Sequence, residues 1–167
     1  MKHATAFLAT PLFWALLVLA SGCGKRMDRD LIGACGTGNT NEIRRLLALG
    51  ANVNCQDGSL NRWTPLIWAL FEGDDDAAQV LLAAGANPNI KDGTGHSTLS
   101  FAVRPGDHSA VIRALVLAGA NSVEYKPLFE GLSETDTNRI AFEEALAEAS
   151  RSNQVPSGAA APQPKKP

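Results

Sequence analysis

The chain has 167 residues, of which 45% are hydrophobic and 19% are charged, and its formal net charge is −2. This length suits one domain with appendages, and the hydrophobic content is high enough for a packed core, which excludes a wholly disordered chain. The sequence has no large basic patch and no long run of Lys and Arg, so we do not expect a nucleic-acid partner.

Residues 1–22 differ in composition from the rest of the chain. Lys2 and His3 give a polar, positive start, and they are followed by an apolar run to Ala20 that contains no charged residue. Small residues then precede a cysteine, which is the order typical of a secretory signal peptide. A membrane-spanning anchor is the alternative, although an apolar stretch of about 17 residues is at the short limit for a transmembrane helix.

The five residues Leu-Ala-Ser-Gly-Cys that end at Cys23 resemble the lipobox of bacterial lipoproteins. The resemblance implies that Cys23 is acylated and becomes the mature N-terminus, with residues 23–29 as a short tether. Several acyl chains would hold the protein to a membrane, because each buried CH₂ contributes about 0.8 kcal/mol. Ala20 departs from the family, which prefers Leu there. Gly24 stands where Asp favours the inner membrane, which implies the periplasmic face of the outer membrane.

The middle of the chain contains a sequence repeat of about 35 residues. The string Leu-Leu-Ala-Leu-Gly-Ala-Asn around Gly50 returns with one change around Gly85 and with more changes around Gly119, so the glycines are spaced by 35 and 34 residues. The pair Asp-Gly at position 57 also returns 35 residues later, at position 92. Agreement between two registers indicates a true structural repeat.

Each unit has the residues expected of two helices and a hairpin loop. Thr64 caps the first helix and Pro65 occupies its first position, where the missing N–H is harmless. Gly73 ends this helix, and three aspartates then place negative charge at the start of the second helix. Gly85 is expected to end the second helix in the left-handed conformation, before a turn-rich hairpin at residues 87–95.

These motifs resemble the ankyrin repeat, which is marked by Thr-Pro-Leu, Leu-Leu-x-x-Gly-Ala-Asn-x-Asn and Asp-Gly at these offsets. The match covers about Leu31 to Asn121, although Ile67 and Ser100 stand where the family usually has His. The resemblance implies an all-α ankyrin-repeat solenoid of about three to four helix-turn-helix units with hairpin loops. We place this domain at residues 30–151.

The last parts of the chain depart from the repeat pattern. Pro127 is expected to begin a degenerate fourth unit, and the apolar face from Asp136 to Ser150 predicts a helix that caps the stack. Residues 152–167 are rich in Pro, Ala and Gly and have little to bury, so we expect them to be disordered.

No group of residues has the spacing of a catalytic or metal site. The aspartates at 74–76 do not match a calcium-binding loop, and the three histidines are isolated in sequence. Cys35 and Cys55 fit as small buried residues, and a disulfide between them remains open. We therefore expect no enzymatic activity, metal ion, cofactor or small-molecule substrate.

The ankyrin resemblance implies a protein partner, because such domains bind with hairpin tips and first helices along a concave face. The positions that this pattern selects are Leu60, Asn61, Arg62, Trp63, Phe71, Glu72, Thr94, His96, Arg104 and Pro105. Aromatic and Arg residues contribute most at interfaces. Packing of Trp63 on the neighbouring repeat is an equal alternative, and Trp68 is expected in the core.

Together, the sequence predicts a lipid-anchored module of the bacterial envelope that binds another protein. Two alternatives stay open. One is an immunity protein that neutralises a periplasm-acting toxin. The other is a structural envelope lipoprotein whose Pro/Ala tail contacts the cell wall.

Overall fold

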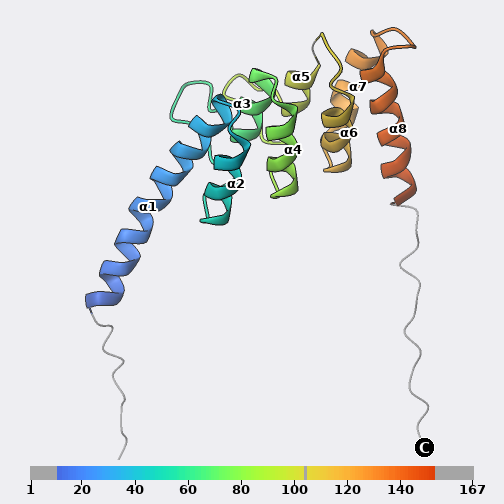
Figure 1. The fold of residues 1–167 in the computed structure, drawn as a ribbon. Helices are drawn as coiled ribbons and strands as arrows, with labels where there is room; N and C mark the ends of the chain where they lie inside the picture. Colours follow the sequence, from blue (N-terminus) through green and yellow to red (C-terminus); the bar gives the residue numbers. More distant parts are fainter. Residues whose placement is uncertain (1–10, 104, 153–167) are drawn as a thin grey trace, which may run out of the picture.

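The computed structural model describes residues 11–103 and 105–152, and helices are the only regular elements in that part of the chain. The helices are α1 (Pro11–Gly36), α2 (Thr40–Ala48), α3 (Pro65–Glu72), α4 (Asp75–Ala83), α5 (Thr98–Ala102), α6 (Ser109–Leu117), α7 (Ser122–Glu130) and α8 (Thr137–Ser152). They form four consecutive helix pairs that stack into an arc (Figure 1). The predicted all-α solenoid is therefore confirmed.

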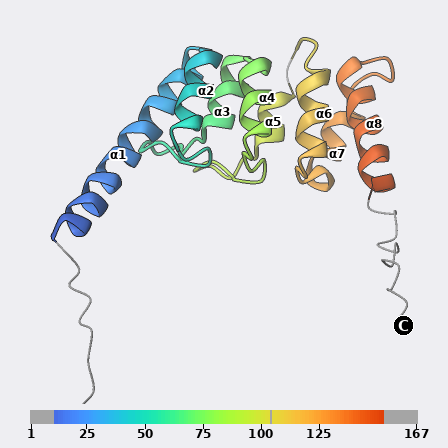
Figure 2. The same ribbon diagram turned by 60° about the horizontal axis from the view of Figure 1, so that its bottom comes forward.

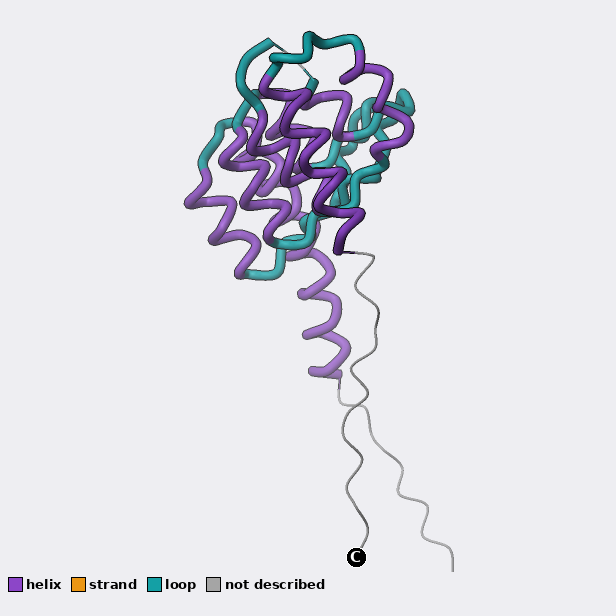
Figure 3. Tube along the Cα trace, turned by 90° about the vertical axis from the view of Figure 1, so that its right-hand side faces the viewer, coloured by secondary structure: helices purple, strands orange, loops and turns teal. Residues whose placement is uncertain are grey.

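The helix pairs form two layers. The first helices α1, α3, α5 and α7 contact one another in sequence, and the second helices α2, α4, α6 and α8 do the same. Figure 3, which views the stack from the α8 side, shows the helices lying side by side with the loops gathered at their ends. One continuous hydrophobic core runs between the layers, because each unit buries its apolar residues against its neighbours.

Helix α1 is longer than the first helix of the other units. It contains residues 23–29, the segment expected to act as a tether, and Met27 already packs against the core. No helix within the described residues is both long and apolar enough to cross a membrane. Residues 1–10 of the expected signal peptide and residues 153–167 of the expected tail lie outside the described residues.

The repeated Gly-Ala string has a conformational cause. Each of its glycines has a positive φ, between 85° and 92°, which confirms the left-handed ending predicted for Gly85. The following alanine N–H then donates to the carbonyl of a leucine five residues earlier, at 3.0 Å in every unit. These pairs are Ala51 with Leu46, Ala86 with Leu81, and Ala120 with Leu115.

A ladder of side-chain to backbone hydrogen bonds, which we call the asparagine ladder, joins successive units. In each step a side-chain oxygen accepts the backbone N–H of the Asn that follows Gly-Ala. Asn54 and Asn89 accept from the next unit, whereas Asp28 of α1 accepts within the first unit. The acceptor and donor pairs are Asp28 with Asn52 at 2.7 Å, Asn54 with Asn87 at 2.7 Å, and Asn89 with Asn121 at 2.8 Å. The second Asn of the repeated motif therefore connects its unit to the next one.

The fourth unit differs from the prediction in where it begins. Helix α7 starts at Ser122, directly after the Gly-Ala-Asn string, so Pro127 lies inside the helix instead of at its start. Proline removes one helical hydrogen bond at that position. The helix continues because Phe129, two residues later, is 1% exposed and stacks on the equally buried Phe142 of α8, with ring centroids 4.0 Å apart.

Helix α8, at the position of the expected capping helix, packs extensively against α6. The Asn138 side chain is buried, accepts the His108 N–H at 2.8 Å and donates to the Gly106 carbonyl at 2.8 Å. A salt bridge between Arg113 and Glu148 also joins the two helices. The last helix pair thus closes the stack with both apolar and polar contacts.

Removing one step of the asparagine ladder should destabilise the fold. Asn89 also donates its side-chain amide to the Gly119 carbonyl at 2.9 Å, so Asn89→Ala removes two contacts between units. We expect the free energy of unfolding to fall by about 1–2 kcal/mol, measured by urea denaturation. Asn41→Ala, at an exposed position on α2, is the matched control. Equal stabilities of the two variants would contradict a structural role for the ladder.

Candidate functional site

Four aromatic rings from the second and third units pack together, and we call them the aromatic surface: Trp63, Trp68, Phe71 and Phe101. The ring centroid of Trp63 lies 4.6 Å from Phe71, 4.8 Å from Trp68 and 5.7 Å from Phe101. Trp68 and Phe71 are three residues apart on α3 and so share one face of that helix. Phe71 is 49% exposed, and the other three rings are partly buried.

The two indoles of the aromatic surface are held differently. The Trp68 Nε1–H donates to the Asp57 carboxylate at 3.1 Å, and the ring packs against the core while one part stays exposed. Trp63 packs on the next unit through Phe101, yet its Nε1–H is buried without an acceptor among the described residues. A buried N–H without a partner is unfavourable, so packing of the rings holds the Trp63 side chain, while two hydrogen bonds to Asp57 hold its backbone.

The loop before α3 lies against the loop before α5 (Figure 2). The Gly93 N–H donates to the Asn61 carbonyl at 2.6 Å, and a Cβ at Gly93 would collide with the Leu60 carbonyl oxygen. Leu60 itself is 96% exposed at the tip of its loop. Arg62, with a φ of 49°, donates to the Gln56 side chain at 2.8 Å. The two loops are therefore joined by backbone contact.

A buried carboxylate organises the loop before α5. Asp92 accepts hydrogen bonds from the Thr94 hydroxyl at 2.7 Å and from the His96 N–H at 2.8 Å. Burial alone would raise the pKa of Asp92, but hydrogen bonds from Thr94 and His96 outweigh it, so the pKa lies below its usual value of 3.8. The exposed His96 ring is thereby held 6.3 Å from Phe101, at the edge of the aromatic surface.

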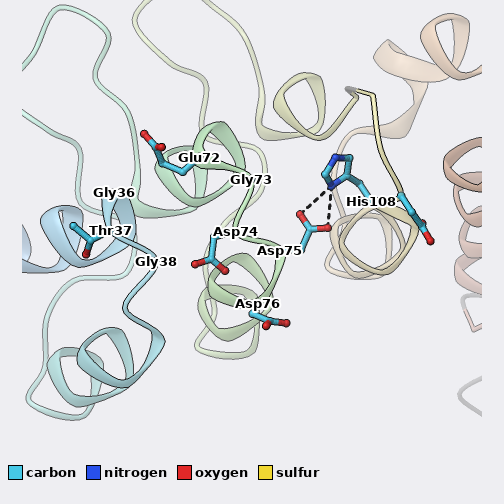
Figure 4. Close-up of a pocket in the computed structure, with 10 residues that line it drawn as sticks. Gly36, Thr37, Gly38, Glu72, Gly73, Asp74, Asp75, Asp76 and His108 are labelled. Carbon is cyan, nitrogen blue, oxygen red and sulfur yellow. Dashed lines mark hydrogen bonds and ion pairs between the residues drawn. The ribbon is translucent and has the colours of Figure 1, made fainter.

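A groove of about 630 Å³ lies at the C-terminal end of α3 (Figure 4). We call it the acidic groove; it is lined by Gly36, Thr37, Gly38, Glu72, Gly73, Asp74, Asp75, Asp76, Asp107 and His108. Asp75 pairs with the His108 ring at 3.0 Å, and Asp74 caps α4 by accepting the Ala77 N–H at 2.8 Å. Glu72 and Asp76 are exposed, and their carboxylates bond to no described residue.

The structure places most of the residues selected from the sequence on one side of the molecule. Leu60, Asn61, Arg62 and Trp63 lie in the first loop, and Thr94 and His96 lie in the second. Phe71 and Glu72 are the last two residues of α3: Phe71 belongs to the aromatic surface, and Glu72 lines the acidic groove. Arg104 lies outside the described residues, and Pro105 is exposed beside it. The sequence pattern does not indicate the groove, because Asp74–Asp76 predict a helix start and do not match a calcium-binding loop.

The cysteines show no sign of a reactive site in the described part of the chain. Cys35 and Cys55 are both buried and free, so the disulfide that the sequence left open is not formed. Burial raises the pKa of each thiol to about 12, which keeps both protonated at neutral pH. The Cys23 side chain lies outside the described residues. No three described His, Cys, Asp or Glu side chains form a group able to hold a metal ion.

Stacked helix pairs with a repeated Gly-Ala turn and a hydrogen-bonded ladder define a solenoid repeat protein. A family model described as ankyrin repeats (3 copies) matches residues 12–92 and 31–126. The chain therefore belongs to the ankyrin-repeat family, whose domains are protein–protein interaction modules and are typically not enzymes.

The chain is also similar to a solved ankyrin repeat domain from Acinetobacter baumannii. The two sequences are 35% identical, the TM-score is 0.49, and the match covers 55% of this chain and 47% of that one. This chain thus spans about half the length of that structure. A search of curated proteins finds no match.

The Asp92 carboxylate should stabilise the loop that carries His96. Because its folded-state pKa is lowered, its charge contributes stability above pH 3.8, and that contribution is lost as the pH falls through the folded-state pKa. We expect Asp92→Asn to lower the free energy of unfolding by about 1 kcal/mol at neutral pH. Denaturation at several pH values should show this difference shrinking below pH 3.8, and a difference independent of pH would contradict the assignment.

Proposed function

We propose that this protein is a membrane-tethered adaptor of the bacterial envelope, which binds a partner protein through the aromatic surface and the two adjoining loops. The observation that carries the proposal is the packed cluster of Trp63, Trp68, Phe71 and Phe101, which stays partly exposed between units. Large aromatic rings that remain partly exposed in a rigid setting are the residues that contribute most binding energy at interfaces.

The surroundings of the aromatic surface support this role. The Leu60 side chain is almost fully exposed at the tip of the neighbouring loop, where the described fold does not bury it. The loop backbone is held by Gly93 and by Asp92, so its side chains are presented from an ordered support. A rigid apolar surface loses little conformational entropy on binding, which favours affinity.

The tether is proposed from the sequence around Cys23, where small residues follow an apolar run. Helix α1 continues from there into the first unit, and Met27 and Asp28 already contact the repeat domain. An acyl group on Cys23 would therefore hold the repeat stack close to the membrane surface, with little free chain between them.

The tether is tested with Cys23→Ala in the full chain, and Cys35→Ala is the control. Expressed in bacteria with a clickable fatty acid, the parent and the control should incorporate label and sediment with membranes. Cys23→Ala should lose the label and leave the membrane fraction. Label retained in Cys23→Ala would refute acylation at this residue, and unlabelled protein that stays in the membrane would favour a spanning anchor.

The binding surface is tested by crosslinking capture from envelope extract with the full chain as bait. Trp63→Ala with Phe71→Ala should lose a partner that the parent captures, by about tenfold or more, since each aromatic contact at an interface contributes about 1–2 kcal/mol or more. Leu117→Ala, at an exposed apolar position on α6, is the matched control and should capture normally.

Circular dichroism must first show equal helix content in all the baits. Equal capture by the parent and the double variant would refute the aromatic surface as the site. No specific capture by any bait would favour the two alternatives to an envelope adaptor, a structural lipoprotein or an immunity protein whose toxin comes from a competitor.

A further inference from the structure

Resting on the proposed function, we propose that the partner presents a basic segment in which an arginine adjoins an apolar side chain. The apolar side chain packs on the aromatic surface, and the arginine enters the acidic groove. The structure brings these two features together along one helix, because α3 carries Phe71 on the aromatic surface and Glu72 at the groove. A Cβ added at Gly36, which lines the groove, would lie 3.9 Å from the Trp68 ring, so the groove borders the aromatic surface.

The charge of the groove favours a cationic ligand. Among the described residues, five carboxylates line it, and His108 is the one lining side chain that can carry a positive charge. Three of the five already have a partner in the fold: Asp74 with Ala77, Asp75 with His108, and Asp107 with Ser109. The remaining two, Glu72 and Asp76, face solvent and bond to no described residue. Such a field attracts basic segments and repels acidic ones.

The arrangement of the carboxylates favours an extended ligand over a metal ion. Figure 4 shows Asp74 directed toward the loop of the first unit, while Asp75 points to His108 of the third unit. The described residues bring no three of these groups together as metal ligands. Charges spread along a groove suit a flexible cationic side chain, which can pair with one carboxylate at a time.

Arginine fits this position better than lysine. Its planar guanidinium binds a carboxylate through two parallel hydrogen bonds and also stacks on aromatic faces. Both kinds of partner are present at the end of α3, where Phe71 is half exposed and Glu72 follows it. Attraction between a cation and an aromatic ring adds to this pairing at exposed sites, so the apolar and acidic parts of the surface reinforce each other.

The test is a selection of random peptides displayed on phage against the full chain. The groove variant combines Glu72→Gln with Asp76→Asn and so removes the two unpaired carboxylates. The control combines Glu134→Gln with Glu144→Gln, which changes the net charge equally at exposed sites of the fourth unit. We expect enriched peptides to carry arginine beside Leu, Phe or Trp. A synthetic enriched peptide should bind the groove variant about five- to tenfold more weakly and the control unchanged.

A second measurement replaces arginine in the enriched peptide with citrulline, which has the same shape but no charge. The change to citrulline should weaken peptide binding to the parent by about the same factor as the groove substitutions do. It should not weaken binding to the groove variant any further. Enrichment without excess arginine, equal binding of groove and control variants, or no enrichment at all would overturn the basic-segment proposal. Capture that still depends on Trp63 and Phe71 would then leave the proposed function standing.

Discussion

The backbone N–H of the Asn that follows each Gly-Ala turn donates to a side-chain oxygen outside its own helix. The preceding unit supplies this acceptor for Asn87 and Asn121, and α1 of the first unit supplies it for Asn52. The acceptors Asp28, Asn54 and Asn89 repeat this contact at almost constant length. The asparagine ladder thereby fixes the distance and the register between units. The packing of Trp63 on Phe101 depends on it, because these rings come from different units.

Local chemistry made much of the fold predictable from sequence. The positive φ at Gly85 and the Thr64 cap, whose hydroxyl accepts the Ile67 N–H at 3.2 Å, follow from neighbouring residues alone. The predicted start of α7 was wrong. A proline usually marks the start of a helix, but here burial of Phe129 keeps the helix continuous through Pro127. The asparagine ladder was not predicted from the sequence, and its first acceptor, Asp28, lies inside α1 and outside the repeated motif.

The site shows the same division between local and distant effects. The repeat pattern indicated Trp63 and Phe71, because the family pattern selects loops and first helices. The acidic groove was not predictable in this way, since its lining comes from turns of three different units. Only the folded stack brings Gly38 against Asp74, where a Cβ on the glycine would meet the carboxylate, and His108 against Asp75. Sequence spacing carries no information about such contacts.

The close approach of Gly93 to the Leu60–Asn61 backbone couples two segments that are distant in sequence. Because several hydrogen bonds and one steric contact hold the loops together, we expect them to move as one unit. A ligand that immobilises Leu60 thereby also restricts the loop of His96, and the entropy of ordering both is lost in one step. Recognition by the two loops is therefore expected to be all-or-none, with neither loop adapting to a ligand independently of the other.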